Sequence, residues 1–257
     1  MSDWLPCPYS SSYRFGVKKV RAQWDVLHAL DAEPLPENEA VLHAWALFHS
    51  GKFEAAEAAG LAAGSAGMSV ANRATAAYAT LLEPHEKTRL DLYQRILQRA
   101  LQDTALHPTR ASAWYWQGYA LGRYAQGIHV ARALAQGIGA QIRFALETTL
   151  QLAPNHAFAH ASLGGFHAEV IDKVGPLVAA MTYGARADIA RRHLREALQL
   201  APDSAAIHWD YASALLMMNG TAHLDEATRL QEQATQIKPR DAVERLWVEL
   251  ARTHLSL

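Results

Sequence analysis

Four helix-forming stretches of the 257-residue chain stop in the same way, at a proline. The prolines are Pro108, Pro154, Pro202 and Pro239, and after each come a polar residue and a new stretch rich in alanine or aromatic residues. Proline has no backbone N–H and cannot continue a helix, so it ends one helix and directs the chain into the next. The recurring stop therefore predicts a regular array of helices.

A small residue follows three of these prolines at a fixed distance of ten residues: Gly118, Gly164 and Ala212. A larger side chain there would hold two packed helices apart. A second apolar stripe precedes the later prolines, as with Ala190 and Ala197 before Pro202. Residues 39–63 follow the same pattern near the start of the chain. Apolar spacings of three and four residues, with few strand-forming runs, predict an all-α fold made of helix pairs.

The order of large residue, small residue, Gly turn, Ala, Ala and Pro resembles the tetratricopeptide repeat over roughly residues 37–240. This resemblance implies a right-handed solenoid of about five helix pairs, with the first helix of each pair lining the concave face. We expect an N-terminal arm and capping helix in residues 1–36, centred on 17–30. A second capping helix is expected in residues 241–257, because a solenoid needs atypical ends to shield its open core.

Two of the repeat units are longer than the usual repeat of about 34 residues. They span 46 residues from Pro108 to Pro154 and 48 from Pro154 to Pro202. The extra segments are apolar at 128–134 and 176–181, and we expect short helical turns that bury this surface and project from one edge.

The segment from Trp114 to Gln126, with the long unit that follows, resembles the T component of TRAP-type transporters. Residues 164–185 are similar to bacterial relatives of the regulator-of-microtubule-dynamics family. The first resemblance implies a helical-repeat protein that associates with a solute-binding subunit. The second implies a repeat protein without a defined role.

Composition excludes several classes of function. Half of the residues are hydrophobic, and the formal net charge of −1 gives no general attraction to nucleic acid or anionic membrane. The single cysteine, Cys7, builds neither a disulfide framework nor a cysteine-based zinc site. The start of the chain has no secretory pattern and no run is long enough to span a membrane, so we expect a cytoplasmic protein.

The chain carries 13 histidines but no zinc-protease pattern, phosphate loop, dinucleotide fingerprint or nucleophile elbow. His156, His160 and His167 lie near one another, as metal ligands would. However, His160 and His167 fall on helix-pairing positions, and His43 and His208 match core positions of other units. We therefore expect structural histidines, no metal, no cofactor and no catalytic residue.

The concave face is the predicted binding site. When the repeat pattern is aligned on Gly118 and the equivalent positions of other units, the residues on that face are Trp45, His49, Tyr115, Trp116, Tyr119, Arg123, Trp209 and Asp210. Aromatic side chains with a few charges are typical of peptide-binding surfaces. The alternative is that the N-terminal arm or the extra turns cover them. The predicted function is a non-catalytic adaptor or scaffold that binds a protein or peptide, and the alternative is a transporter accessory subunit. The partner stays unnamed and homo-oligomerisation stays open.

Overall fold

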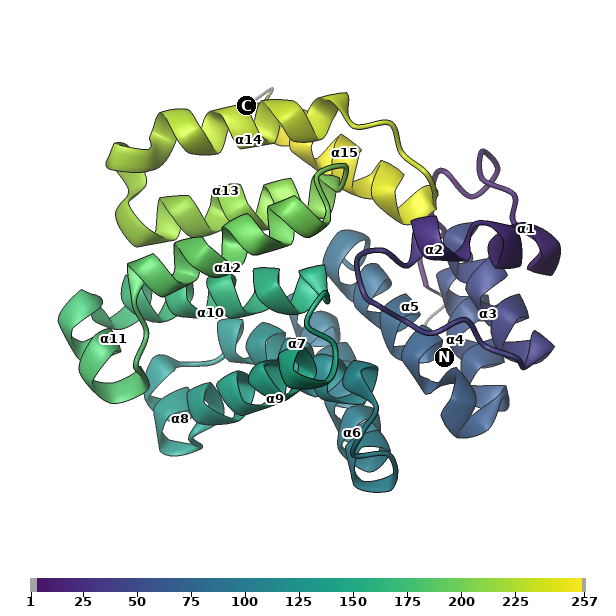
Figure 1. The fold of residues 1–257 in the computed structure, drawn as a ribbon, viewed down its shortest axis with the longest axis horizontal. Helices are drawn as coiled ribbons and strands as arrows, with labels where there is room; N and C mark the ends of the chain where they lie inside the picture. Colours follow the sequence, from purple (N-terminus) through teal and green to yellow (C-terminus); the bar gives the residue numbers. More distant parts are fainter. Residues whose placement is uncertain (1–3, 256–257) are drawn as a thin grey trace.

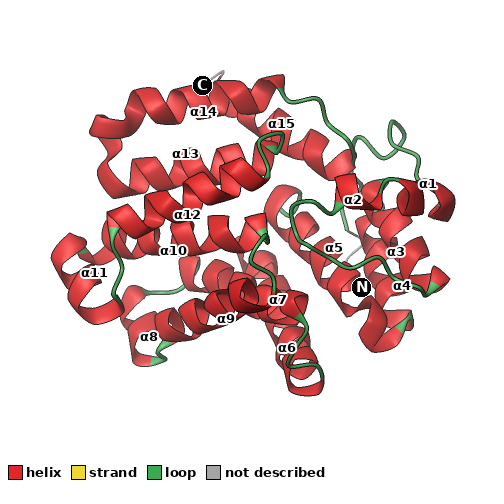
Figure 2. Cartoon of the chain, viewed as in Figure 1, coloured by secondary structure: helices red, strands yellow, loops and turns green. Residues whose placement is uncertain are grey.

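The computed structural model describes residues 4–255, which form helices joined by turns and loops, with no strand among them (Figure 2). The helices are α1 (Val17–Ala22), α2 (Trp24–Leu27), α3 (Glu39–His49), α4 (Phe53–Ala62), α5 (Met68–Leu81), α6 (Glu86–Leu106), α7 (Ala111–Gln126), α8 (Val130–Ala135), α9 (Ile138–Leu152), α10 (Ala157–Val174), α11 (Pro176–Tyr183), α12 (Ala187–Leu200), α13 (Ala205–Asn219), α14 (Leu224–Gln236) and α15 (Ala242–Leu255). Short 3-10 turns cover Gly64–Gly67 and Gly220–His223.

Five helix pairs form the array: α3 with α4, α5 with α6, α7 with α9, α10 with α12, and α13 with α14. Successive pairs stack side by side and the array curves, so that α15, which follows the last pair, reaches the first pair (Figure 1). The prediction of an all-α helical-repeat solenoid is confirmed.

The small residues of the repeat lie where the two helices of a pair touch. A Cβ added at Gly118 would lie 2.8 Å from Cγ of Leu146 on α9, and one at Gly164 would lie 2.6 Å from Cγ of Leu194 on α12. Real Cβ contacts are not this short, so only glycine permits this approach of the helices. The proline-based register therefore holds in the two long units.

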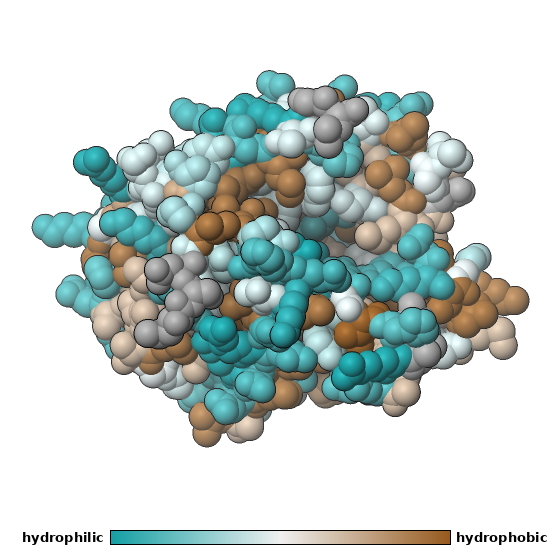
Figure 3. All heavy atoms as spheres, turned by 180° about the vertical axis from the view of Figure 1, so that it is seen from behind, coloured by the Kyte–Doolittle hydropathy of each residue, from teal (hydrophilic) through white to brown (hydrophobic). Residues whose placement is uncertain are grey.

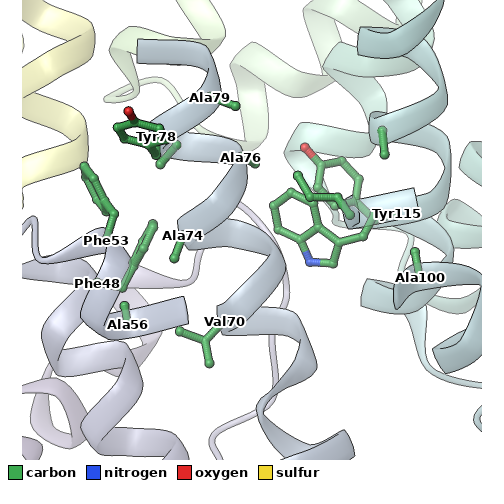
Figure 4. Close-up of a cluster of buried hydrophobic side chains, with 14 of the residues drawn as sticks. Phe48, Phe53, Ala56, Val70, Ala74, Ala76, Tyr78, Ala79, Ala100 and Tyr115 are labelled. Carbon is green, nitrogen blue, oxygen red and sulfur yellow. The ribbon is translucent and has the colours of Figure 1, made fainter. Parts of the chain in front are cut away.

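Helix α5 is buried on opposite faces. Figure 4 shows Tyr78 and Ala74 on the side that faces Phe48 and Phe53, with Tyr115 of α7 on the other side. The Tyr78 ring also stacks on Trp4, with ring centroids 4.3 Å apart. Burial on opposite faces is expected for a helix in the interior of an array, and α5 joins the first pair to the later ones.

The two long units contain the expected extra helices, α8 and α11. The expectation that both bury their apolar residues is wrong for α11. Its Leu177 and Met181 are 72% and 80% exposed, because this helix of eight residues contacts the array mainly through the buried Ala179. In the other segment Ile128 is partly buried, whereas the side chains of Val130, Ala131 and Leu134 lie outside the described residues.

The single helix expected over residues 17–30 is two short helices. Gln23 leaves the helical conformation, with φ −112° and ψ 14°, and the chain changes direction there. The apolar stripe is nevertheless buried, with Val20, Trp24 and Leu27 at most 6% exposed. This N-terminal segment, residues 4–38, is called the arm below.

The arm packs on the first pair and α15 on the last pair, and the arm and α15 also meet (Figure 1). Gly51 lies against both, since an added Cβ would be 2.9 Å from Cβ of Ala242 and 3.0 Å from Sγ of Cys7. Gly51 also has φ +77°, which favours glycine on its own account. The predicted division at residues 36/37 and 240/241 stays a prediction.

On the face seen from behind, hydrophobic patches interrupt a largely hydrophilic surface (Figure 3). Within residues 4–255, no helix combines the length and apolar character needed to cross a membrane.

Candidate binding cavity

The concave side of the array encloses a cavity of about 590 Å³. Its walls come from the first helices of all five pairs, α3, α5, α7, α10 and α13, together with α9 and α15 and single residues of α8 and α11. A volume of this size is typical of a site for a small molecule or a short chain segment. The predicted role of the first helices, lining the concave face, describes the structure correctly.

The cavity is buried in one part and open to solvent in another. Its buried walls include Phe48, at the end of α3, and Tyr115 and Trp116 of α7, all at most 6% exposed. Gln126, at the end of α7, and Lys173, near the end of α10, also line the cavity and are exposed, so the cavity is open to solvent beside them.

Helix α7 supplies an aromatic wall. The ring of Tyr115 lies 4.9 Å from that of Trp116 and 5.9 Å from that of Tyr119. The Tyr119 hydroxyl shares a hydrogen bond of 2.8 Å with the Thr80 hydroxyl, which in turn lies 3.1 Å from the Tyr93 hydroxyl. Burial raises the pKa of Tyr93 to about 12. The wall is thus rigid, and the Tyr93 hydroxyl stays protonated in the physiological range.

Two residues of opposite charge, Arg123 of α7 and Asp210 of α13, line the cavity beside these aromatic side chains. The Arg123 guanidinium lies 5.3 Å from the ring centre of Tyr119 and donates a hydrogen bond of 3.3 Å to the Gln126 side chain. Burial opposes its charge, but the attraction of Tyr119 and Asp210 outweighs burial and the pKa of Arg123 is raised. Burial raises the pKa of Asp210, and Arg123 partly offsets that effect.

The predicted site residues divide into two groups. Six line the cavity: Tyr115, Trp116, Tyr119, Arg123, Trp209 and Asp210. The other two, Trp45 and His49, are only 1% and 0% exposed and do not reach it. Their placement in the groove is therefore corrected, because the arm covers the concave side of the first pair.

The arm holds these two residues through aromatic and polar contacts. Trp24 meets Trp45 edge to face, with ring centroids 5.9 Å apart. The Nε2 atoms of His28 and His49 lie 3.4 Å apart, and His49 Nδ1 lies 2.6 Å from a carboxylate oxygen of Asp241. Burial, together with the neighbouring His49, lowers the pKa of His28 well below its usual value, so His28 is neutral.

The same arm contacts two residues that line the cavity, Arg73 and Phe158. Asp31 forms an ion pair with Arg73, which lines the cavity from α5. The Phe158 amide, at the start of α10, donates a 3.1 Å hydrogen bond to the Leu30 carbonyl. We call the contact of the arm with α3, α5 and α15 the junction; its polar residues are His28, Asp31, His49, Arg73 and Asp241.

Sequence reasoning missed several lining residues. The register applied to Gly164 gives Ala161, Ser162, Gly165 and Glu169, which all line the cavity and leave it room because most are small. That signal was present in the sequence. No such signal marked Arg73 of α5 or Trp247 of α15, because α5 lacks the preceding proline and α15 comes from outside the repeats.

The histidines take mixed positions. His208 and His167 are buried, at 5% and 3% exposure, whereas His43 is exposed and does not fill the expected core position. His160 shares a 2.9 Å hydrogen bond with His193, and burial lowers the pKa of His193 to about 4. Across the described residues, no group of three or more His, Cys, Asp or Glu side chains is arranged to hold a metal ion. The absence of a bound metal stays a prediction.

Comparison with known proteins bears on the fold alone. No protein-family model and no curated protein matches the chain. Among solved structures, the fold is similar to that of a thermophilic TPR protein from Thermus thermophilus, at 19% sequence identity. The match has a TM-score of 0.57 and covers 83% of this chain and 97% of that one. The chain therefore has a TPR-like helical-repeat fold.

Proposed function

We propose that the protein is a non-catalytic scaffold of the cytoplasm that binds a segment of a partner protein in its concave cavity. The observation that carries the proposal is an aromatic cavity, open to solvent, whose charged residues Arg123 and Asp210 have no ion-pair partner among residues 4–255. Rigid aromatic anchors beside a few fixed charges are the usual composition of the centre of a binding site.

The arm supports this proposal, because its residues 24–31 are a chain segment already packed on the concave side of the array. It contributes a tryptophan, Trp24, that packs against Trp45, and a carboxylate, Asp31, that pairs with Arg73. Its Leu30 carbonyl accepts a backbone hydrogen bond from α10. A partner segment would use the same three kinds of contact in the half of the surface that the arm leaves open.

A substitution that fills the cavity tests the proposal. Gly122 of α7 lines the cavity, and an added Cβ there meets no atom within 4 Å. Gly122→Leu should therefore occupy the space without a clash, and the loss of a helical glycine favours the fold by up to about 1 kcal/mol. We expect pull-downs from the native cell to lose the partners that the parent recovers, with an unchanged or higher melting temperature.

The matched control is Ala58→Leu, which adds a leucine to an exposed position of α4 away from the cavity. This variant should recover the same partners as the parent. The double variant Tyr119→Ala with Arg123→Ala should lose them while the helical circular-dichroism spectrum is kept. If Gly122→Leu recovers every partner of the parent, the cavity is not the binding site.

A further inference from the structure

Most half-buried arginines of this array reach a carboxylate. Arg99 pairs with Glu57 at 2.7 Å, Arg110 with Asp103 at 2.6 Å and Arg191 with Glu226 at 3.1 Å. Arg123 is also half-buried, but in residues 4–255 its polar contacts are neutral side chains, Gln126 at 3.3 Å and Tyr119. A guanidinium taken partly out of water without an anion is costly, so Arg123 departs from the pattern of its neighbours.

Asp210 is the counterpart across the cavity. It is half-buried on α13, and within the described chain it makes no ion pair within 4 Å and no hydrogen bond. Other acidic residues of the concave side are paired, as Asp31 is with Arg73 and Asp241 with His49. The charges of Arg123 and Asp210 affect each other's pKa, but the two side chains form no ion pair. Both charges therefore remain available at the cavity wall.

Of the other charged residues that line the cavity, Asp172 is exposed, whereas Glu169, Lys173 and Arg73 have charged partners within the described chain. Glu169 pairs with Lys173 at 3.0 Å and accepts a hydrogen bond of 2.9 Å from Gln126. Arg73 is held by the arm. The half-buried charges of the cavity that contact no opposite charge are thus one cation, Arg123, and one anion, Asp210, and the aromatic side chains of Tyr119 and Trp209 line the same cavity.

From this arrangement we infer that the cavity selects a short dipolar peptide segment, with an acidic side chain that binds Arg123, a basic one that binds Asp210, and an apolar side chain between them. The inference rests on the proposed function and specifies the chemistry of the bound segment. A guanidinium forms bidentate hydrogen bonds to a carboxylate, and this geometry fixes the orientation of the bound carboxylate as well as selecting its charge. The cavity volume of about 590 Å³ limits the bound segment to a few residues.

The test uses capped tripeptides, because blocked ends leave side-chain charges as the only ones. Acetyl-Glu-Phe-Lys-amide and its reverse, acetyl-Lys-Phe-Glu-amide, are titrated into the full chain and followed by tryptophan fluorescence and calorimetry. Two singly charged peptides carry Gln in place of Glu or of Lys. We expect at least one dipolar peptide to bind about tenfold more tightly than its singly charged forms, as a charge-assisted hydrogen bond in a partly buried site predicts.

Protein variants assign each charge. Arg123→Gln should weaken binding of the dipolar peptide about tenfold but leave the peptide without Glu unaffected. Asp210→Asn should likewise weaken binding of the dipolar peptide but leave the peptide without Lys unaffected. Gly122→Leu should abolish binding of all four peptides. Equal affinity of all peptides for the parent, or no measurable binding of either dipolar peptide, overturns the inference. If the peptides bind without charge preference and Gly122→Leu removes that binding, the charge rule fails while the cavity stands as a binding site.

Discussion

The junction and the cavity lie on the same concave surface, and both combine aromatic rings with buried or half-buried charges. At the junction the arm supplies Asp31 as the partner of Arg73, and the residue before α15 supplies Asp241 as the partner of His49. In the cavity Arg123 and Asp210 have no ionic partner in residues 4–255. The two regions have similar side chains, but the chain itself fills one and leaves the other open. Aromatic and charged residues at concave positions of a repeat helix therefore predict a binding surface. The position of the arm decides whether that surface binds a segment of the protein itself or stays open.

The largest effect should come from breaking the junction. Asp31→Ala would leave the Arg73 guanidinium buried without its anion and remove the carboxylate that His28 contacts at 3.1 Å. Loss of one partner of a buried ion pair typically costs about 3–5 kcal/mol. Urea unfolding followed by circular dichroism should show this loss in the free energy of unfolding. A change below about 1 kcal/mol would mean that the arm does not hold its place through this pair.

The next largest effect is expected from a comparison of two faces of α10, one packed against α12 and one that lines the cavity. Gly164 faces the contact with α12, whereas an added Cβ at its neighbour Gly165 meets nothing within 4 Å and points to the cavity. Gly164→Leu should cost roughly 1–3 kcal/mol or more by overpacking the pair. Gly165→Leu should leave the melting temperature unchanged or raise it. Equal losses for the two variants would contradict the repeat register.

A smaller and pH-dependent effect is expected where α15 closes on α13. A carboxylate oxygen of Glu244 accepts a 2.5 Å hydrogen bond from the Ala205 amide, and burial raises the pKa of Glu244 to about 7. A carboxyl whose folded pKa lies above its usual 4.5 contributes stability that is complete below that value and is lost as pH rises through 7. Glu244→Gln keeps an acceptor but cannot ionise. The melting temperature of the variant relative to the parent should therefore rise between pH 5 and pH 8.

The difference in melting temperature between Glu244→Gln and the parent isolates the contribution of Glu244. The buried histidines have the opposite pH dependence, because their contribution to stability is lost as pH falls. Burial lowers the pKa of His167 to about 4, so its contribution is complete above pH 6.5 and is lost as pH falls toward 4. His167→Gln should flatten the acid side of the stability profile and leave the side above pH 7 unchanged. A parallel shift of both variants at every pH would show that neither group titrates as its burial predicts.

The smallest effect on stability is expected in the cavity. Asp210→Asn removes a half-buried carboxylate with no direct partner in the described chain, so the free energy of unfolding should stay within about 0.5 kcal/mol of the parent or increase slightly. Thermal unfolding of this variant beside Asp31→Ala gives the sharpest contrast between the two regions. A loss comparable to that of Asp31→Ala would show that Asp210 is a structural residue and not one kept for a ligand.

The sequence by itself determined the repeat and its register. Pro108, Pro154 and Pro202 stop helices because proline lacks an N–H, and Gly118 and Gly164 mark contacts because no Cβ fits against Leu146 or Leu194. These are local rules of backbone and side-chain size, so they can be deduced from spacing alone. The same register placed Tyr115, Tyr119 and Arg123 on the concave face, where they line the cavity.

Only the tertiary structure decided which part of that face is open. Trp45 and His49 satisfy the same register, but residues 24–33 cross over them because Asp31, Leu30 and Trp24 find partners on α5, α10 and α3. The curvature of the array brings α15 to the junction and adds Trp247 to the cavity wall. Such contacts join residues far apart in the chain, and their formation depends on the summed rotation of stacked pairs, which no local spacing specifies.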